Sequence, residues 1–124
     1  MIQKRYVLQI LFFLISACGV ASAATLTPAD YNRAEVQKMV REAHTAEQYR
    51  QLAEYYRWQQ QEFEERARAE EHEWVRRVFQ VSIPEKYPRP EDSSRYRYEY
   101  FSYEAARMNS LAAHYFVLAA EPGR

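Results

Sequence analysis

The residues of this chain best suited to chemistry are its three histidines, His44, His72 and His114. Imidazole is a common ligand of transition metals, so these side chains raise the hypothesis of a metal site. A helical zinc site favours closely spaced histidines, but neither His-x3-His nor His-Glu-x-x-His occurs. A site at a single histidine would use His72 with the carboxylate of Glu99 or a tyrosine hydroxyl, and His114 is a further candidate ligand. The interpretation we favour is that each histidine is a solvated or hydrogen-bonded side chain, and we expect no cofactor.

Glycine is nearly absent from the chain, which excludes several enzyme classes. Gly19 and Gly123 are its two glycines, so no residue between them has glycine's freedom to adopt positive φ in a tight turn. Phosphate-binding loops, dinucleotide-binding turns and the nucleophile elbow each need glycine at fixed positions. Paired carboxylates for glycoside chemistry need a cleft, which a narrow helical protein does not offer. The sequence predicts no catalytic residue and a protein that is not an enzyme.

The charge balance argues against a nucleic-acid partner. The chain has 17 Lys and Arg residues against 17 Asp and Glu residues, without the basic excess of a nucleic-acid-binding surface. Acidic runs within 62–73 are interleaved with arginines at a spacing that predicts ion pairs along a solvated helix face. The expected pairs are Glu62–Arg66, Glu64–Arg68 and Glu73–Arg77.

The first two dozen residues have the composition of an export signal. Lys4 and Arg5 precede an apolar run over 6–15, and small residues follow over 16–24. This is the order of a secretory signal peptide, and the apolar run is shorter than the roughly 20 residues that a membrane-spanning helix needs. We expect 1–23 to be a signal peptide and 24–124 to be a single helical domain. Without 1–23 the formal charge is −2, because 15 basic and 17 acidic residues remain.

Two processing sites compete within this segment. Ala21-Ser22-Ala23 fits an ordinary signal peptidase that cleaves before Ala24. Ile15-Ser16-Ala17-Cys18 resembles the lipobox of bacterial lipoproteins, which implies cleavage before Cys18, diacylation of its thiol and a lipid tether to the membrane. Cys18 is the one cysteine of the chain, so neither route leaves a thiol pair for a disulfide. The expected localisation is exported, either periplasmic or anchored to the membrane by lipid.

Helices must position these residues, because prolines mark the boundaries and good helix formers fill the stretches between them. Thr27-Pro28-Ala29-Asp30 combines a hydroxyl N-cap, proline at the first helical position and an acid, which predicts a helix start. Pro84, Pro88 and Pro90 predict a hinge over 83–92. Apolar residues recur every three or four positions on both sides of it. The predicted fold is all-α: an antiparallel helical hairpin with helices over about 46–80 and 93–120, and a short N-terminal helix over about 28–43.

Two local patterns leave alternatives open. Thr45-Ala46-Glu47-Gln48 matches a capping box, which favours a new helix near Ala46, although the apolar stripe over 36–78 continues through it without a change of phase. We favour two helices here. The segment 96–100 alternates with a period of two, as a strand does, but no other segment supplies a partner strand. We therefore expect a helix there as well.

The hairpin geometry separates the histidines. With a hinge centred near residue 86, an antiparallel pairing places His72 opposite the neighbourhood of Phe101 and His114 opposite that of Gln59. His72 and His114 are then about 13 residues apart along the bundle, or roughly 20 Å at 1.5 Å per residue. A single ion cannot bridge that distance.

The stretch after the hinge predicts a wide apolar face. One stripe consists of Tyr100, Tyr103, Arg107, Leu111, Tyr115 and Leu118. A second stripe beside it consists of Phe101, Ala105, Met108, Ala112, Phe116 and Ala119. Arginine stacks on aromatic rings and pairs with carboxylates, and both residue types are enriched in protein interfaces. A two-helix core buries its aromatics incompletely, so we expect a protein partner or a second copy of the chain to cover part of this face, including the cluster over 95–103.

One pattern extends over most of the predicted hairpin. It combines Thr45-Ala46-Glu47-Gln48-Tyr49, Leu52-Ala53, Tyr55-Tyr56, His72 and Leu111-Ala112-Ala113-His114. This pattern resembles uncharacterised bacterial exported proteins and lipoproteins that are small helical hairpins. Members of that group often carry histidine in place of Tyr49 and a His-Cys pair near Arg95-Tyr96, so a site built on that pair is missing here. The resemblance implies that His72 and His114 match positions of that group, and it assigns no role to either residue.

These observations predict a non-enzymatic, exported cell-envelope protein that acts by protein–protein contact or self-association. The alternative is a periplasmic metal-binding or metal-sensing helical protein built around His72 and nearby carboxylates.

Overall fold

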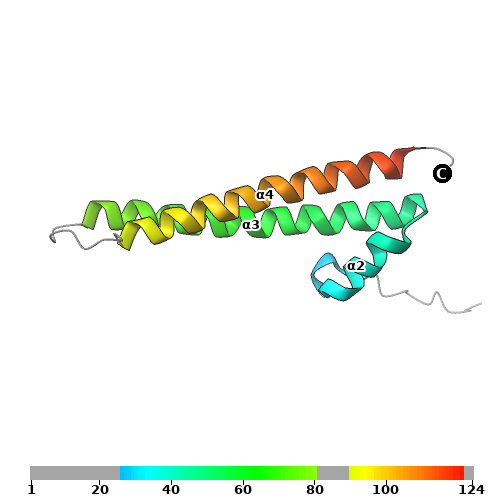
Figure 1. Cartoon of the computed structure of the whole chain (residues 1–124), viewed down its shortest axis with the longest axis horizontal. Helices are drawn as coiled ribbons and strands as arrows, with labels where there is room; N and C mark the ends of the chain where they lie inside the picture. Colours follow the sequence, from blue (N-terminus) through cyan, green and yellow to red (C-terminus); the bar gives the residue numbers. More distant parts are fainter. Residues whose placement is uncertain (1–25, 81–89, 122–124) are drawn as a thin grey trace, which may run out of the picture.

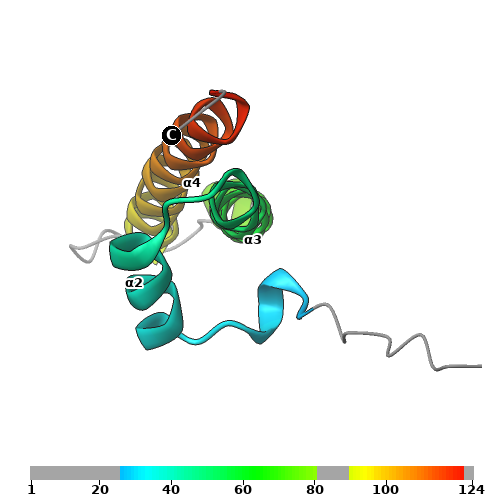
Figure 2. The ribbon, with the colours of Figure 1, turned by 90° about the vertical axis from the view of Figure 1, so that its right-hand side faces the viewer.

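The protein is an antiparallel pair of long helices with a short helix against one end. The structure, a computed structural model, describes residues 26–80 and 90–121. It contains the 3-10 turn η1 (Pro28–Asp30) and the helices α2 (Arg33–Glu42), α3 (Ala46–Gln80) and α4 (Pro90–Ala120). α3 and α4 lie side by side, while η1 and α2 contact α3 near its N-terminal end (Figures 1 and 2). The predicted all-α hairpin is confirmed, and the segment 96–100 is helical.

Several expectations concern residues that the structure does not describe. The signal peptide over 1–23, its Cys18 and most of the hinge over 83–92 lie outside the described ranges. Within the described ranges, no helix has both the length and the apolar character needed to cross a membrane.

The predicted short N-terminal helix is confirmed as α2, but the turn η1 comes before it, so α2 begins at Arg33 and not near residue 28. The Asp30 carboxylate accepts hydrogen bonds from the Thr27 N–H at 2.8 Å and its hydroxyl at 2.6 Å, which close η1 and lower the pKa of Asp30. Asn32 then starts α2: its side chain accepts from the Glu35 N–H at 3.0 Å, and the Glu35 carboxylate accepts from the Asn32 N–H at 2.8 Å. A second capping box therefore divides the segment.

The capping box predicted at Thr45 starts α3, and 28–80 is not one helix. The Gln48 N–H donates to the Thr45 hydroxyl at 3.3 Å, while the Gln48 side-chain oxygen accepts from the backbone of His44 at 2.9 Å and of Thr45 at 3.2 Å. Ala43 ends α2 with an extended backbone, at φ −64° and ψ 126°. The Tyr49 hydroxyl donates to the Ala43 carbonyl at 3.1 Å and ties the end of α2 to α3.

α4 begins at Pro90, before the expected start at about 93. Proline lacks the N–H that the first turn of a helix would leave unsatisfied, and its fixed φ suits this position. Glu91 and Asp92 lie in the first turn, where negative charge interacts favourably with the helix dipole. Pro90 therefore starts the helix rather than belonging to the hinge.

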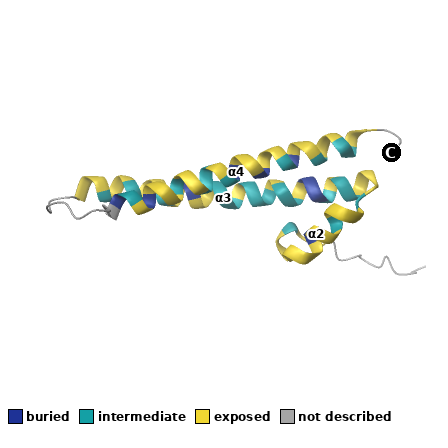
Figure 3. Cartoon of the chain, viewed as in Figure 1, coloured by how far each residue is buried: buried dark blue, intermediate teal, exposed yellow. Residues whose placement is uncertain are grey.

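A heptad repeat forms the seam between α3 and α4, which we call the inner seam. Its residues follow one another at alternating intervals of three and four, and all are buried or half-buried (Figure 3). On α3 they are Tyr49, Ala53, Tyr56, Gln60, Phe63, Ala67, Glu70, Trp74 and Arg77. On α4 they are Glu91, Ser94, Tyr98, Phe101, Ala105, Met108, Ala112, Tyr115 and Ala119. A strict seven-residue repeat is typical of left-handed coiled-coil packing.

Rings on one helix alternate with small residues on the other along the inner seam. Tyr56 stacks on Tyr115 with ring centroids 5.6 Å apart, and Phe63 stacks on Phe101 at 6.2 Å. This register places the rings of Tyr49, Tyr56 and Phe63 opposite Ala119, Ala112 and Ala105, and the rings of Phe101 and Tyr115 opposite Ala67 and Ala53. Ala53, Ala67, Ala105 and Ala112 are each only 6–7% exposed. Each ring thus fills the space that a small side chain leaves, as close packing requires.

The pairing differs from the one expected from the midpoint of the hinge. Phe101 packs on Phe63 and not opposite His72, while Arg97 on the next turn donates to Glu70 at 2.8 Å. The fit of large to small side chains sets the register, because shifting the helices by a few residues would place rings opposite rings. Burial of the stacked rings raises the pKa of Tyr56 and of Tyr115, and nearby tyrosines raise both further.

Candidate functional site

The three candidate metal ligands do not form a cluster. His72 is exposed on α3, and His114 is exposed near the end of α4, with its ring 5.2 Å from that of Tyr115. Glu99 accepts a hydrogen bond from Arg95 on its own helix at 3.0 Å. Across 26–80 and 90–121, no group of three His, Cys, Asp or Glu residues lies close enough together to hold a metal ion.

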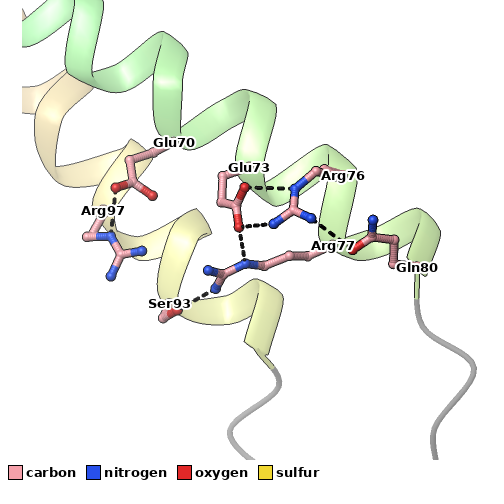
Figure 4. A network of polar contacts seen from close by, with 7 residues as sticks. All are labelled: Glu70, Glu73, Arg76, Arg77, Gln80, Ser93 and Arg97. Atoms are coloured by element: carbon pink, nitrogen blue, oxygen red, sulfur yellow. Dashed lines mark hydrogen bonds and ion pairs between the residues drawn. The ribbon is translucent and has the colours of Figure 1, made fainter.

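A polar network joins α3 and α4 beside the hinge (Figure 4). The Glu73 carboxylate accepts from Arg76 at 2.6 and 2.9 Å and from Arg77 at 2.7 Å, and these hydrogen bonds lower the pKa of Glu73 to about 2. Arg77 also donates to Ser93 of α4 at 3.3 Å. Together with Arg97 and Glu70, these side chains hold the two helix ends together, so we assign the network to structure.

The predicted wide apolar face of α4 divides into an inner and an outer part. Ala105, Met108 and Ala112 from the second predicted stripe are buried in the inner seam. Tyr100 and Tyr103 from the first stripe are exposed. The two stripes overlap in the sequence, and packing against α3 decides which side is covered.

Three tyrosines on the outer face of α4 form the surface best suited to binding. Tyr96, Tyr100 and Tyr103, which we call the tyrosine stripe, are 66%, 55% and 67% exposed. They follow one another at intervals of four and three, so they share one face, while Tyr98 and Phe101 between them point to α3. Tyr96 belongs to neither of the two stripes predicted from the sequence. The heptad spacing of the inner seam is the sequence signal that could have identified Tyr96, because Tyr96 lies on the face of α4 opposite to that seam.

The charges beside the tyrosine stripe are paired. Arg95 donates to Glu99 at 3.0 Å, and Arg107 donates to Glu104 at 3.3 Å. An aromatic centre with a polar, charge-balanced border is the usual anatomy of a protein interface. Tyrosine adds both apolar area and a hydroxyl, which makes it a frequent anchor of binding energy.

The second half of the same outer face is lined by small side chains. Ala106, Ser110, Ala113 and Ala120 are exposed, together with Val117, which is 57% exposed. The Ser110 hydroxyl donates back to the Ala106 carbonyl at 3.2 Å, so it lies flat against its own helix. The outer face is thus bulky near the hinge and shallow towards Ala120.

Comparison with known proteins found no matching family model, no matching curated protein and no matching solved structure. The resemblance to exported helical-hairpin proteins therefore stays a prediction. The outer face of α4 is the described surface of this chain best suited to binding.

Proposed function

We propose that this is a non-enzymatic, exported protein of the cell envelope that acts by binding another protein chain through the outer face of α4. The observation that carries the proposal is the tyrosine stripe, which exposes more than half of each of three large side chains. Exposed aromatics gathered on one face mark interaction sites in soluble proteins, because leaving them in water forgoes the hydrophobic free energy of burial. The signal-like composition of 1–23 supports export.

The binding surface can be tested in cells by photo-cross-linking from the tyrosine stripe. We expect a photoreactive residue in place of Tyr103 to give a discrete adduct in the envelope fraction. The matched control places the same residue at Arg68, which is exposed on α3, and should give no such adduct. If neither Tyr96, Tyr100 nor Tyr103 yields an adduct above that of the Arg68 control, the proposed function fails.

Export and processing can be tested by the intact mass of the protein from its own host. Cleavage before Ala24 gives an unmodified chain that begins at Ala24, whereas lipoprotein processing gives a chain that begins at Cys18 and carries acyl groups. We propose that one of these two forms is found in the periplasm or on a membrane. A full-length, cytoplasmic chain with Met1 would contradict export.

A further inference from the structure

A second heptad repeat runs along the outer face of α4, away from α3. Its positions, which we call the outer seam, follow at alternating intervals of three and four residues, as those of the inner seam do. They are Tyr96, Glu99, Tyr103, Ala106, Ser110, Ala113, Val117 and Ala120, and all eight are exposed. Both seams repeat every seven residues. When α4 packs on α3 along the inner seam, the outer seam therefore stays on the opposite side of α4 along its whole length.

The outer seam is complementary to itself when reversed. Its bulky members, Tyr96 and Tyr103, lie in the first half, and its small members, Ala113 and Ala120, lie in the second. In an antiparallel pair of α4 helices centred near residue 108, Tyr103 comes opposite Ala113 and Tyr96 opposite Ala120. This repeats the rule of the inner seam, where rings pack opposite alanines.

We propose that the chain that covers the outer face of α4 is a second copy of this protein, docked α4 against α4 in antiparallel orientation around a twofold axis near residue 108. The inference rests on the proposed function and names its partner. The assembly has four long helices in one layer, with α4 and its copy at the centre and α3 of each copy outside. A twofold axis makes such a contact closed, so it stops at the dimer.

The side chains next to the outer seam agree with this register. Tyr100 and Phe116, which is 62% exposed, come to the same level of the pair, one on each side of the outer seam. The least apolar layer pairs Glu99 with Val117, and Arg95 already neutralises Glu99 within each chain.

The area is also sufficient. An aromatic side chain buries about 150–250 Å², so each tyrosine of the stripe, at 55–67% exposed, still offers about 100–150 Å². Full burial of six such rings, with an equal area covered on the opposite copy, removes at most about 1,200–1,800 Å² from water. Stable interfaces begin at about this size.

Sedimentation of the full chain carrying Cys18→Ser, produced in an exporting host, tests the proposal. We expect a dimer at concentrations of about 1–100 µM, because an interface of standard size gives a dissociation constant in or below this range. Ala113→Arg should raise the dimer dissociation constant at least about tenfold, because symmetry places the new side chain against Tyr103 twice. Tyr103→Ala should act similarly. Both sites are exposed in one chain, so circular dichroism should show unchanged helix content.

Matched controls lie on α3. Ala69→Arg adds the same side chain at an exposed alanine, and Phe79→Ala removes an aromatic that is 85% exposed. Both should leave the dissociation constant unchanged. A chain that stays monomeric throughout overturns the proposal, as does a dimer that survives both Ala113→Arg and Tyr103→Ala.

Orientation is tested by disulfide trapping in the same Cys18→Ser chain. An equal mixture of Ala106→Cys and Ser110→Cys should form the mixed disulfide in excess over both same-site products, because these positions face each other across the axis. A parallel pair would give the same-site products instead and overturn the proposal. A monomeric chain that still photo-cross-links to a different envelope protein also overturns it, yet leaves the proposed function standing.

Discussion

At the scale of single residues, Glu73 is the described side chain whose pKa is shifted most strongly. Its carboxylate accepts hydrogen bonds from two arginines, which favour its charged form and hold its pKa at about 2, against an ordinary value of 4.5. Stability that comes from a lowered pKa is complete above the unfolded pKa and disappears as pH falls through the folded one. The contribution of Glu73 is therefore present above about pH 5 and lost between there and pH 2.

Replacing this carboxylate should make the hairpin less stable at neutral pH and leave it unchanged in acid. We expect Glu73→Gln to lower Tm by about 1–3 °C at pH 7, since exposed pairs contribute little. The difference from the wild type should shrink as pH falls from about 5 to 2. Thermal unfolding followed by circular dichroism at several pH values measures it.

Glu71→Gln is the matched control, because Glu71 is exposed on the same helix and no ion pair is described for it. Its Tm should equal that of the wild type at pH 7. A Glu73→Gln deficit of equal size at pH 7 and pH 2 would show that the arginine pairs do not cause it.

At the scale of elements, the alternation of rings and alanines in the inner seam determines how α3 and α4 pair. Ala67 is 6% exposed and comes opposite Phe101. Ala67→Leu forces extra volume into this layer, and overpacking of this kind costs about 1–3 kcal/mol. We expect the free energy of unfolding in urea to fall by that amount.

Ala69→Leu makes the same change two residues away, at an exposed position of α3. It should alter the free energy of unfolding by less than about 0.5 kcal/mol. Equal unfolding midpoints for the two variants would mean that the alanine positions do not set the register.

The helices themselves were predictable because their boundaries are encoded locally. Proline at position 90 and the Thr45–Gln48 capping box act within one turn, so their effects can be inferred without a partner element. The Asn32–Glu35 capping box is equally local, but the helix-start pattern of Thr27–Asp30 lies just before it, so the predicted start came five residues too early. Local signals thus account for the predicted helices and for the one boundary that was misplaced.

The pairing of the helices and the binding face were less predictable, because both depend on contacts between distant segments. Arg66 has the spacing to pair with Glu62, yet its guanidinium lies over the rings of Phe63 and Phe101, at 5.9 and 6.0 Å. Phe101 is available to it only once α4 packs on α3. In the same way, two overlapping stripes on α4 predicted an aromatic face. Only the packing of α4 against the inner seam of α3 determines that Tyr96, Tyr100 and Tyr103 lie on the exposed face of α4.

At the scale of the whole molecule, the hairpin has a thin core. Among the described residues, the largest side chains with less than 2% exposure are only a leucine, Leu52, and a serine, Ser94. Most inner-seam rings stay half-buried, since a pair of helices can cover only one side of each. Small chains with this little buried surface usually gain stability from association. The exposed tyrosine stripe offers the surface for it.

If a second copy covers that stripe, stability must depend on protein concentration. For a dimer that unfolds to separate chains, a hundredfold increase in concentration stabilises each chain by about 1.4 kcal/mol, by mass action. In a domain of this size that amounts to a rise in Tm of about 5 °C or more. Thermal unfolding between about 2 and 200 µM measures it. Ala113→Arg should unfold at one temperature over the whole range, because it removes the association and leaves each hairpin intact. A wild-type Tm that is equally independent of concentration would mean that each hairpin folds alone and leaves its tyrosines in water.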